Sequence, residues 1–336
     1  MNRRMENELF SLKDSYILRG VAIIMVTFSH YVVWVSEWLM KPLLTDALSR
    51  LGCYGVDIFF LLSGYALCKT TQGKKVDLSF ALRRLKNMYL PYLLIAGIIE
   101  LSAGGITTLN GLRKYLLGED YWFIFNILIF YIAFFVIWRI GKLRLLLMGL
   151  FTLGFSYLLY RNGRQDFWYV SNAAFFLGIL AGKYEQKLCR LISRLYPLVL
   201  AVLIAGMGIF VYLGLSSSAK LLIYPWELHL QFLANLWWTV LVIYSARLVV
   251  YHGPVLQFLG KHSLYLYMLH TFVYFQVLNL FTFKLSWVLS HGEQPWVLLC
   301  AIVITVISGW ILKVLCDRIF VFVEKLISRR KRNINE

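Results

Sequence analysis

The sequence predicts an all-α membrane protein with about ten transmembrane helices. Two observations on composition lead to this prediction: 60% of the 336 residues are hydrophobic and only 15% are charged, and the mean hydropathy is +0.68. A soluble domain of this length could not bury so much apolar surface. The third observation is a series of apolar runs long enough to span a bilayer, near residues 16–36, 53–69, 87–103, 121–138, 145–160, 167–182, 197–214, 229–246, 262–282 and 296–315.

The distribution of basic residues orients these spans. With the N-terminus in the cytosol, the outer loops hold only eight of the 34 lysines and arginines: Lys41, Arg50, Arg113, Lys114, Arg161, Arg164, Lys220 and Lys284. This bias predicts that both termini are cytosolic, and it explains the net charge of +17 without a nucleic-acid partner. We expect residues 1–336 to form a single transmembrane domain. Residues 325–336 are then a basic cytosolic tail that lies against anionic headgroups.

The first predicted span carries two strongly polar residues, Arg19 near its start and His30 further along. At 1.5 Å per residue, His30 lies about 16 Å beyond Arg19 along the helix axis, well inside the hydrocarbon. An ionisable side chain at that depth should face the bundle interior or a water-filled cavity. His30 is therefore a candidate functional residue, and the alternative is a histidine that only hydrogen-bonds a neighbouring helix.

The second predicted span begins GCYGVDIFFLLSGYAL and places Asp57 just below its outer end. Because consecutive spans run antiparallel, Asp57 and His30 should lie at similar depth. A carboxylate there could orient the histidine and stabilise its charged form. The alternative is that Asp57 only stabilises the first turn of its helix.

A basic segment, FALRRLKNMYLPYLL, brings Arg83, Arg84 and Lys86 to the predicted cytosolic start of the third span. Positive charges and free backbone N–H groups at a helix N-terminus both favour phosphate. The alternative is ordinary positive-inside signalling. The cysteines are scattered singly, without the paired spacing of a metal site, so no metal is expected.

Two later segments add candidates for substrate binding. Glu227, in YPWELHLQF, should lie near the depth of His30, either as a second acid of the site or as a solvated acid at a helix start. The segment LGKHSLYLYMLH carries Tyr267 and His270, which share a helix face because they are three residues apart. His270 either binds substrate or only packs.

Three of these segments resemble the acyltransferase-3 family of integral membrane enzymes. LRGVAIIMVTFSH resembles the family's first helix, GVDIFFLLSGYAL resembles its most recognisable signature, and the Gly260, Ser263, Tyr267 and His270 set resembles its last one. The basic segment is similar to the family's arginine-rich motif but departs from it at Asn87.

The resemblance implies an O-acyltransferase, most simply an O-acetyltransferase, in the plasma membrane. Acetyl-CoA would be its co-substrate, with no permanently bound cofactor, and the acceptor would be a hydroxyl of a cell-surface or lipid-linked carbohydrate. Arg19, Arg83, Arg84 and Lys86 would hold the phosphates of coenzyme A, while His30 would act as general base with help from Asp57. The alternative is a proton-coupled transporter of a small solute or lipid-linked glycan, in which His30 and Asp57 relay protons.

Overall fold

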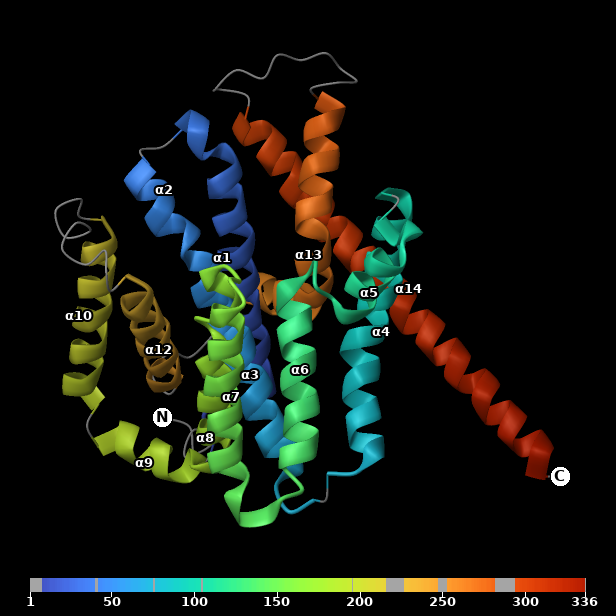
Figure 1. The fold of residues 1–336 in the computed structure, drawn as a ribbon, viewed down its shortest axis with the longest axis horizontal. Coiled ribbons are helices and arrows are strands. Elements are labelled where there is room, and N and C mark those ends of the chain that lie inside the picture. The colour runs from blue at the N-terminus through green and yellow to red at the C-terminus, as the bar shows by residue number, and fades with distance from the viewer. Residues whose placement is uncertain are drawn as a thin grey trace.

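The computed structural model describes residues 8–39, 42–74, 76–103, 105–194, 196–215, 227–246, 253–281 and 294–335. Throughout these ranges the regular structure is helical, which confirms the predicted fold class. Each predicted span overlaps a helix (Figure 1): α1 (Leu12–Leu39), α3 (Leu51–Thr71), α4 (Leu78–Ala103), α6 (Trp122–Ile137), α7 (Arg144–Arg161), α8 (Asn172–Lys183), α10 (Tyr196–Leu215), α12 (Glu227–Ser245), α13 (Pro254–Asn279) and α14 (Gln294–Asn335).

The described ranges also contain short helices that the sequence did not predict. These are α2 (Pro42–Ser49), α5 (Leu109–Leu117), α9 (Glu185–Arg194) and single 3₁₀ turns at Gly105–Thr107, Gly141–Leu143 and Asp166–Trp168. They are too short to cross a bilayer alone, so they escaped an analysis based on the length of apolar runs.

Among the described residues, six helices are long and apolar enough to cross a membrane, or seven if α5 and α6, which meet at a 65° bend, form one broken span. The prediction of about ten spans is therefore supported only as a multi-pass helical bundle, and the cytosolic placement of both termini stays a prediction. When α5 and α6 are counted as one span, the difference lies in three helices. α8 has only 12 residues, and α4 and α13 are long enough but are interrupted by charged or polar residues: Arg83, Arg84 and Lys86 in α4, and Lys261, His262 and His270 in α13.

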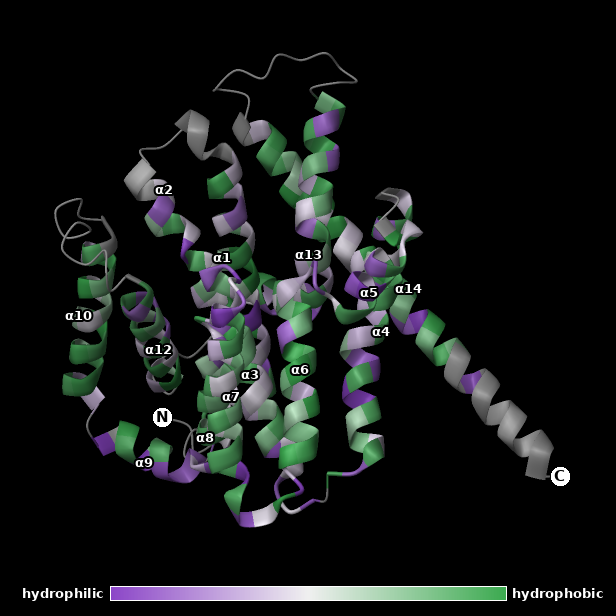
Figure 2. Ribbon diagram, in the orientation of Figure 1, coloured by the Kyte–Doolittle hydropathy of each residue, from purple (hydrophilic) through white to green (hydrophobic). Residues whose placement is uncertain are grey.

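The peripheral helices present apolar side chains outward, as a lipid-facing surface requires (Figure 2). In α7, Leu150 is 57% exposed and Leu153 is 59% exposed, and in α10 Ile209 is 59% exposed. Soluble proteins rarely expose such a large continuous apolar surface to water. The exposure pattern agrees with a protein that crosses the membrane several times.

The core is built from α1, α3, α8 and α13. α1 packs against both α13 and α3, and α3 packs against α8. Glycines permit these close crossings. A Cβ on Gly64 of α3 would collide with the Phe175 carbonyl of α8, so the absence of a side chain there lets these two helices pack closely.

α4 begins earlier than the sequence predicted. Its first residue is Leu78, and the preceding Asp77 accepts a hydrogen bond from the Phe80 N–H at 2.8 Å, as an N-terminal cap does. The predicted span, residues 87–103, lies within this longer helix, so the basic residues are inside the helix instead of before it. Arg83 and Arg84 are therefore more than one turn from the free N–H groups of the helix end.

α14 is a single helix of 42 residues, about 63 Å long at 1.5 Å per residue. Its C-terminal part projects away from the bundle (Figure 1). The predicted basic tail, residues 325–336, therefore continues this helix as far as Asn335.

The close approach of α1 and α13 generates a prediction about stability. A Cβ on Gly260 of α13 would collide with the Tyr16 carbonyl of α1, and that carbonyl is backbone that cannot move aside alone. Gly260→Ala should therefore destabilise the protein by about 1–3 kcal/mol, as overpacking does, and lower the midpoint temperature of unfolding. Gly208→Ala in α10 is the matched control, because its Cβ would meet nothing within 4 Å. An unchanged midpoint for Gly260→Ala would contradict the close crossing.

Candidate functional site

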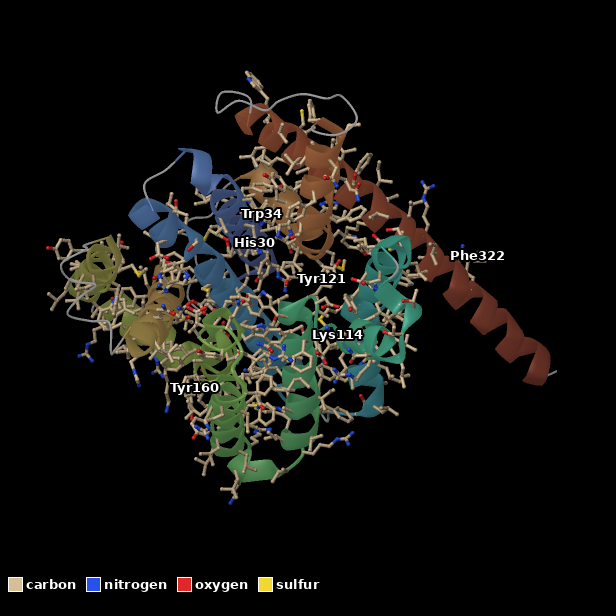
Figure 3. The ribbon with its side chains drawn as sticks, turned by 45° about the horizontal axis from the view of Figure 1, so that its top comes forward. His30, Trp34, Lys114, Tyr121, Tyr160 and Phe322 are labelled. Atoms are coloured by element: carbon tan, nitrogen blue, oxygen red, sulfur yellow. The ribbon has the colours of Figure 1, made fainter. Side chains whose placement is uncertain are left out.

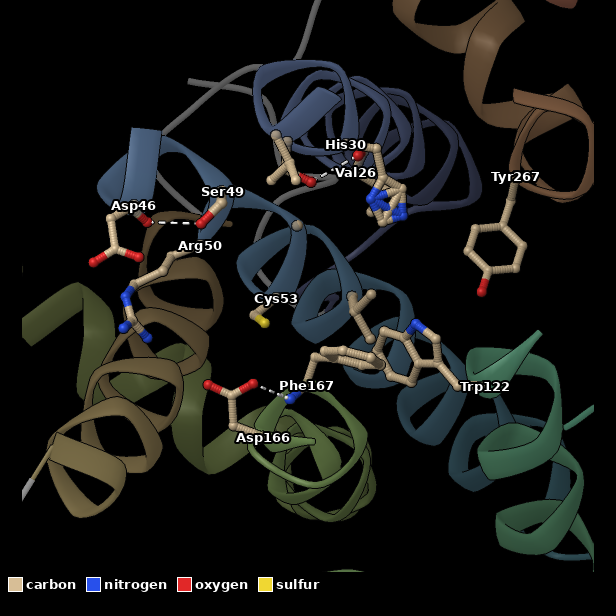
Figure 4. Close-up of a pocket in the computed structure, with 14 residues that line it drawn as sticks. Val26, His30, Asp46, Ser49, Arg50, Cys53, Trp122, Asp166, Phe167 and Tyr267 are labelled. Carbon is tan, nitrogen blue, oxygen red and sulfur yellow. Dashed lines mark hydrogen bonds between the residues drawn. The ribbon is translucent and has the colours of Figure 1, made fainter. Parts of the chain in front are cut away.

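A cavity of about 390 Å³ lies at the end of the bundle where α1 ends and α3 begins. According to the predicted topology this end faces outward. Its walls come from α1, α2, α3, α6, the 3₁₀ turn before α8, and α13 (Figure 4). The residues that line it are Val26, Ser29, His30, Val33, Asp46, Ser49, Arg50, Gly52, Cys53, Val56, Trp122, Asp166, Phe167 and Tyr267.

His30 lines this cavity and stacks on His270 of α13. The two imidazole centroids are 4.9 Å apart and the ring planes differ by 16°. The sequence predicted both residues as candidates but assigned them separate roles. The crossing of α1 and α13 makes them one unit.

Both ring nitrogens of His270 have partners. Its Nδ1 lies 2.6 Å from the Tyr267 carbonyl oxygen, and its Nε2 lies 3.3 Å from the Thr271 hydroxyl. A carbonyl can only accept, so Nδ1 carries a proton and donates it to the Tyr267 carbonyl. The two contacts hold the His270 ring in one orientation. At 2% exposure it is not among the residues that line the cavity, and its predicted contact with substrate stays a prediction.

Aromatic side chains continue the stack away from the cavity. Trp34, one turn after His30 on α1, lies 5.7 Å from the His30 ring and 4.5 Å from the Tyr274 ring between centroids (Figure 3). Tyr274 is 2% exposed and packs on Tyr31. These rings pack against the side of His30 that faces away from the cavity.

Tyr267 also lines the cavity, and its phenol ring points into it (Figure 4). The ring packs edge-on against Phe123, with centroids 5.3 Å apart, in the first turn of α6. The predicted role of Tyr267 as a substrate contact is compatible with this position.

Asp57 lies behind the cavity wall. It is 1% exposed, and within the described ranges neither of its carboxylate oxygens has a hydrogen-bond partner that meets geometric limits. The carboxylate lies beside Ser171, which precedes α8 and whose hydroxyl donates to the Cys53 carbonyl at 3.1 Å. The positive end of the α8 dipole therefore faces this carboxylate. Asp57 makes no direct hydrogen bond to His30, and its part in catalysis stays a prediction.

The predicted donor-binding residues separate in the structure. Arg19 lies within electrostatic range of Arg84, whose guanidinium donates to the Thr70 hydroxyl at 3.1 Å. Arg83 is exposed and donates to the Ser79 hydroxyl on its own helix. Lys86 points toward α14, with its ammonium 5.9 Å from the Phe320 ring centroid. Residues 83, 84 and 86 cannot share one helix face, so only Arg84 can join Arg19.

Glu227 is the first residue of α12, but its side chain lies outside the described residues, so this candidate is not placed. Sequence reasoning missed Asp46, Arg50 and Asp166, which line the cavity. They occupy short connections between spans, where charged residues are ordinary. The only signal was that all three lie on the same predicted side of the membrane as the outer end of the first span.

Comparison with protein families matches residues 15–314 to a family model described as an acyltransferase domain. Comparison with curated proteins and with solved structures gave no match. Within the described residues, no group of three or more His, Cys, Asp or Glu side chains is arranged to hold a metal ion.

Proposed function

The chain belongs to the acyltransferase-3 family of integral membrane acyltransferases, and we propose from this premise that it is an O-acetyltransferase of the plasma membrane. It would transfer an acetyl group from acetyl-CoA to a hydroxyl of a cell-surface or lipid-linked carbohydrate. The observation that carries the proposal is the position of His30, which lines a cavity among the helices and stacks on a hydrogen-bonded His270. The family match favours this enzyme over a proton-coupled transporter.

His30 is the general base of the proposed reaction. Of the two stacked histidines, only His30 lines the cavity, whereas both nitrogens of His270 are engaged. The acceptor hydroxyl loses its proton to His30 as its oxygen attacks the thioester carbonyl. The C–S bond then breaks, and the coenzyme A thiolate takes the proton back from His30. The face of the His270 ring would stabilise the imidazolium that exists between these two steps.

Tyr267 is placed to help at the carbonyl. Negative charge develops on the thioester oxygen as the hydroxyl attacks, and a donor already aimed at that oxygen lowers the barrier. Tyr267 lines the same cavity as His30 (Figure 4), and its hydroxyl has a proton to donate. In the proposal it binds the oxyanion.

The donor would enter from the opposite end of the bundle. Arg19 and Arg84 lie toward that end, on α1 and α4. Arg19 is about 16 Å from His30 along α1, a separation comparable with an extended pantetheine arm. Two guanidinium groups suit the phosphates of coenzyme A, because they donate several charge-assisted hydrogen bonds. The thioester would then reach His30 without a large rearrangement.

The first functional prediction concerns His30. His30→Gln keeps a polar side chain of similar size but removes the base, so turnover of acetyl-CoA should fall by about 10²–10⁴-fold while the protein remains folded. Initial rates of thiol release by purified protein measure this. His229→Gln is the matched control, since His229 is an exposed histidine on α12. If His30→Gln turns over at the wild-type rate, His30 is not the base.

The second prediction separates the two neighbouring arginines. Arg84→Ala should raise the KM for acetyl-CoA by about tenfold or more, the loss expected for a charge-assisted contact. Arg83→Ala should change it little, because Arg83 is exposed and bonded only to Ser79. The KM for the acceptor should stay constant in both variants. Equal effects of the two substitutions on the KM for acetyl-CoA would contradict the donor site at Arg19 and Arg84.

A further inference from the structure

Three charged side chains meet at the rim of the cavity, away from the histidine pair. The side chain of Asp46 reaches the rim from α2, that of Arg50 from the turn before α3, and that of Asp166 from the 3₁₀ turn before α8 (Figure 4). Together they carry a net charge of −1. The Oδ1 atom of Asp166 accepts a hydrogen bond from the Phe167 N–H at 2.8 Å, which fixes the carboxylate in place. The mechanism described above uses none of these residues.

Aromatic rings form the neighbouring wall. Trp122, at the start of α6, and Phe167 both line the cavity, and their ring centroids are 5.3 Å apart. Trp122 is held from behind by Trp168, with centroids 6.4 Å apart. The wall therefore joins two aromatic surfaces from segments distant in the sequence. It borders the rim charges on one side and approaches Tyr267 on the other (Figure 4).

We propose that the rim charges and this aromatic wall form the acceptor subsite, and that it selects an uncharged, hydroxyl-rich ring over an anionic one. This inference rests on the proposed function, which supplies a hydroxyl acceptor but does not state its charge. The two carboxylates can accept hydrogen bonds from the hydroxyls of the acceptor, and the guanidinium of Arg50 can donate hydrogen bonds to the oxygens of those hydroxyls. Aromatic rings cover the apolar face of a saturated ring. A volume of about 390 Å³ falls within the usual range for small-molecule sites.

The charge preference follows from Coulomb's law at short range. A carboxylate on the acceptor would meet two acids and one base in a site bordered by apolar helices, where screening is weaker than in bulk water. At hydrogen-bonding distance and the effective dielectric constant of a protein surface, one unit charge changes an affinity by about tenfold or more. Arg50 would offset only part of the repulsion, because its charge is already opposed by two aspartates. An uncharged ring avoids this cost.

The test uses two probes that differ by one charge, methyl β-D-glucopyranoside and methyl β-D-glucuronide. Saturation-transfer NMR on the purified full chain, in a detergent without a sugar headgroup, gives the affinity of each. The wild type should bind the glucoside at least about tenfold more tightly. Asp166→Asn keeps an acceptor for the Phe167 N–H but removes the charge, so the two affinities should become similar. Trp122→Leu should lower the affinity for both probes to the same extent.

The control is Asp317→Asn, which makes the same charge change on α14 at a residue whose carboxylate pairs with Lys313 at 2.5 Å. It should leave the ratio of the two affinities unchanged. The proposal is overturned if neither probe binds, if the wild type does not discriminate, or if Asp166→Asn and Asp317→Asn have the same effect. Consumption of acetyl-CoA is measured separately. If the wild type binds the glucoside but never consumes acetyl-CoA, the proposed function has failed while the subsite stands.

Discussion

The close crossing of α1 and α13 is the contact on which the candidate site depends. Gly260 lies against the Tyr16 carbonyl and Gly20 lies against the Leu256 carbonyl, so the two backbones approach as closely as helices can. His30 lies further along α1 from Gly20, and His270 lies further along α13 from Gly260. Because α1 and α13 remain packed side by side beyond the glycines, the centroids of the two imidazole rings lie 4.9 Å apart. Any larger side chain at the crossing would separate them.

This arrangement divides the bundle into two chemically different ends. One end has a cavity whose rim carries Asp46, Arg50 and Asp166, and the other end has Arg19 and Arg84. His30 lies between them, on the cavity side. A hydrophobic bundle that holds ionisable groups in its interior must give each one a partner or a cavity, because an isolated charge in the membrane is costly. His270 and the cavity serve that purpose for His30, and the start of α8 does so for Asp57.

The sequence predicted the helices and the two histidines because apolar length and intramembrane polar residues are local signals. Each of the predicted spans overlaps a helix. The sequence also singled out His30, Tyr267 and His270. Pairings between helices were less accessible. The expected partner of His30 was Asp57, since both lie at similar depth, but depth does not specify which face of a helix a residue occupies. The rim residues Asp46 and Asp166 share only a predicted side of the membrane in the sequence, because folding is what brings their segments to one cavity. The predicted third span begins near residue 87, whereas α4 begins at Leu78, because charged residues in the first turns of α4 interrupt the apolar run.

The central claim is that donor and acceptor reach His30 from opposite faces of the membrane. The most direct measurement uses purified protein in sealed vesicles, with acetyl-CoA only inside and an impermeant hydroxyl acceptor, already shown to be acetylated by the solubilised protein, only outside. The account predicts acetylated acceptor outside and free coenzyme A inside, in vesicles with wild-type protein and not with His30→Gln. Because either orientation in the vesicle can be tested by exchanging the two compartments, mixed insertion does not obscure the result. Transfer that occurs only when donor and acceptor share a compartment would contradict the claim.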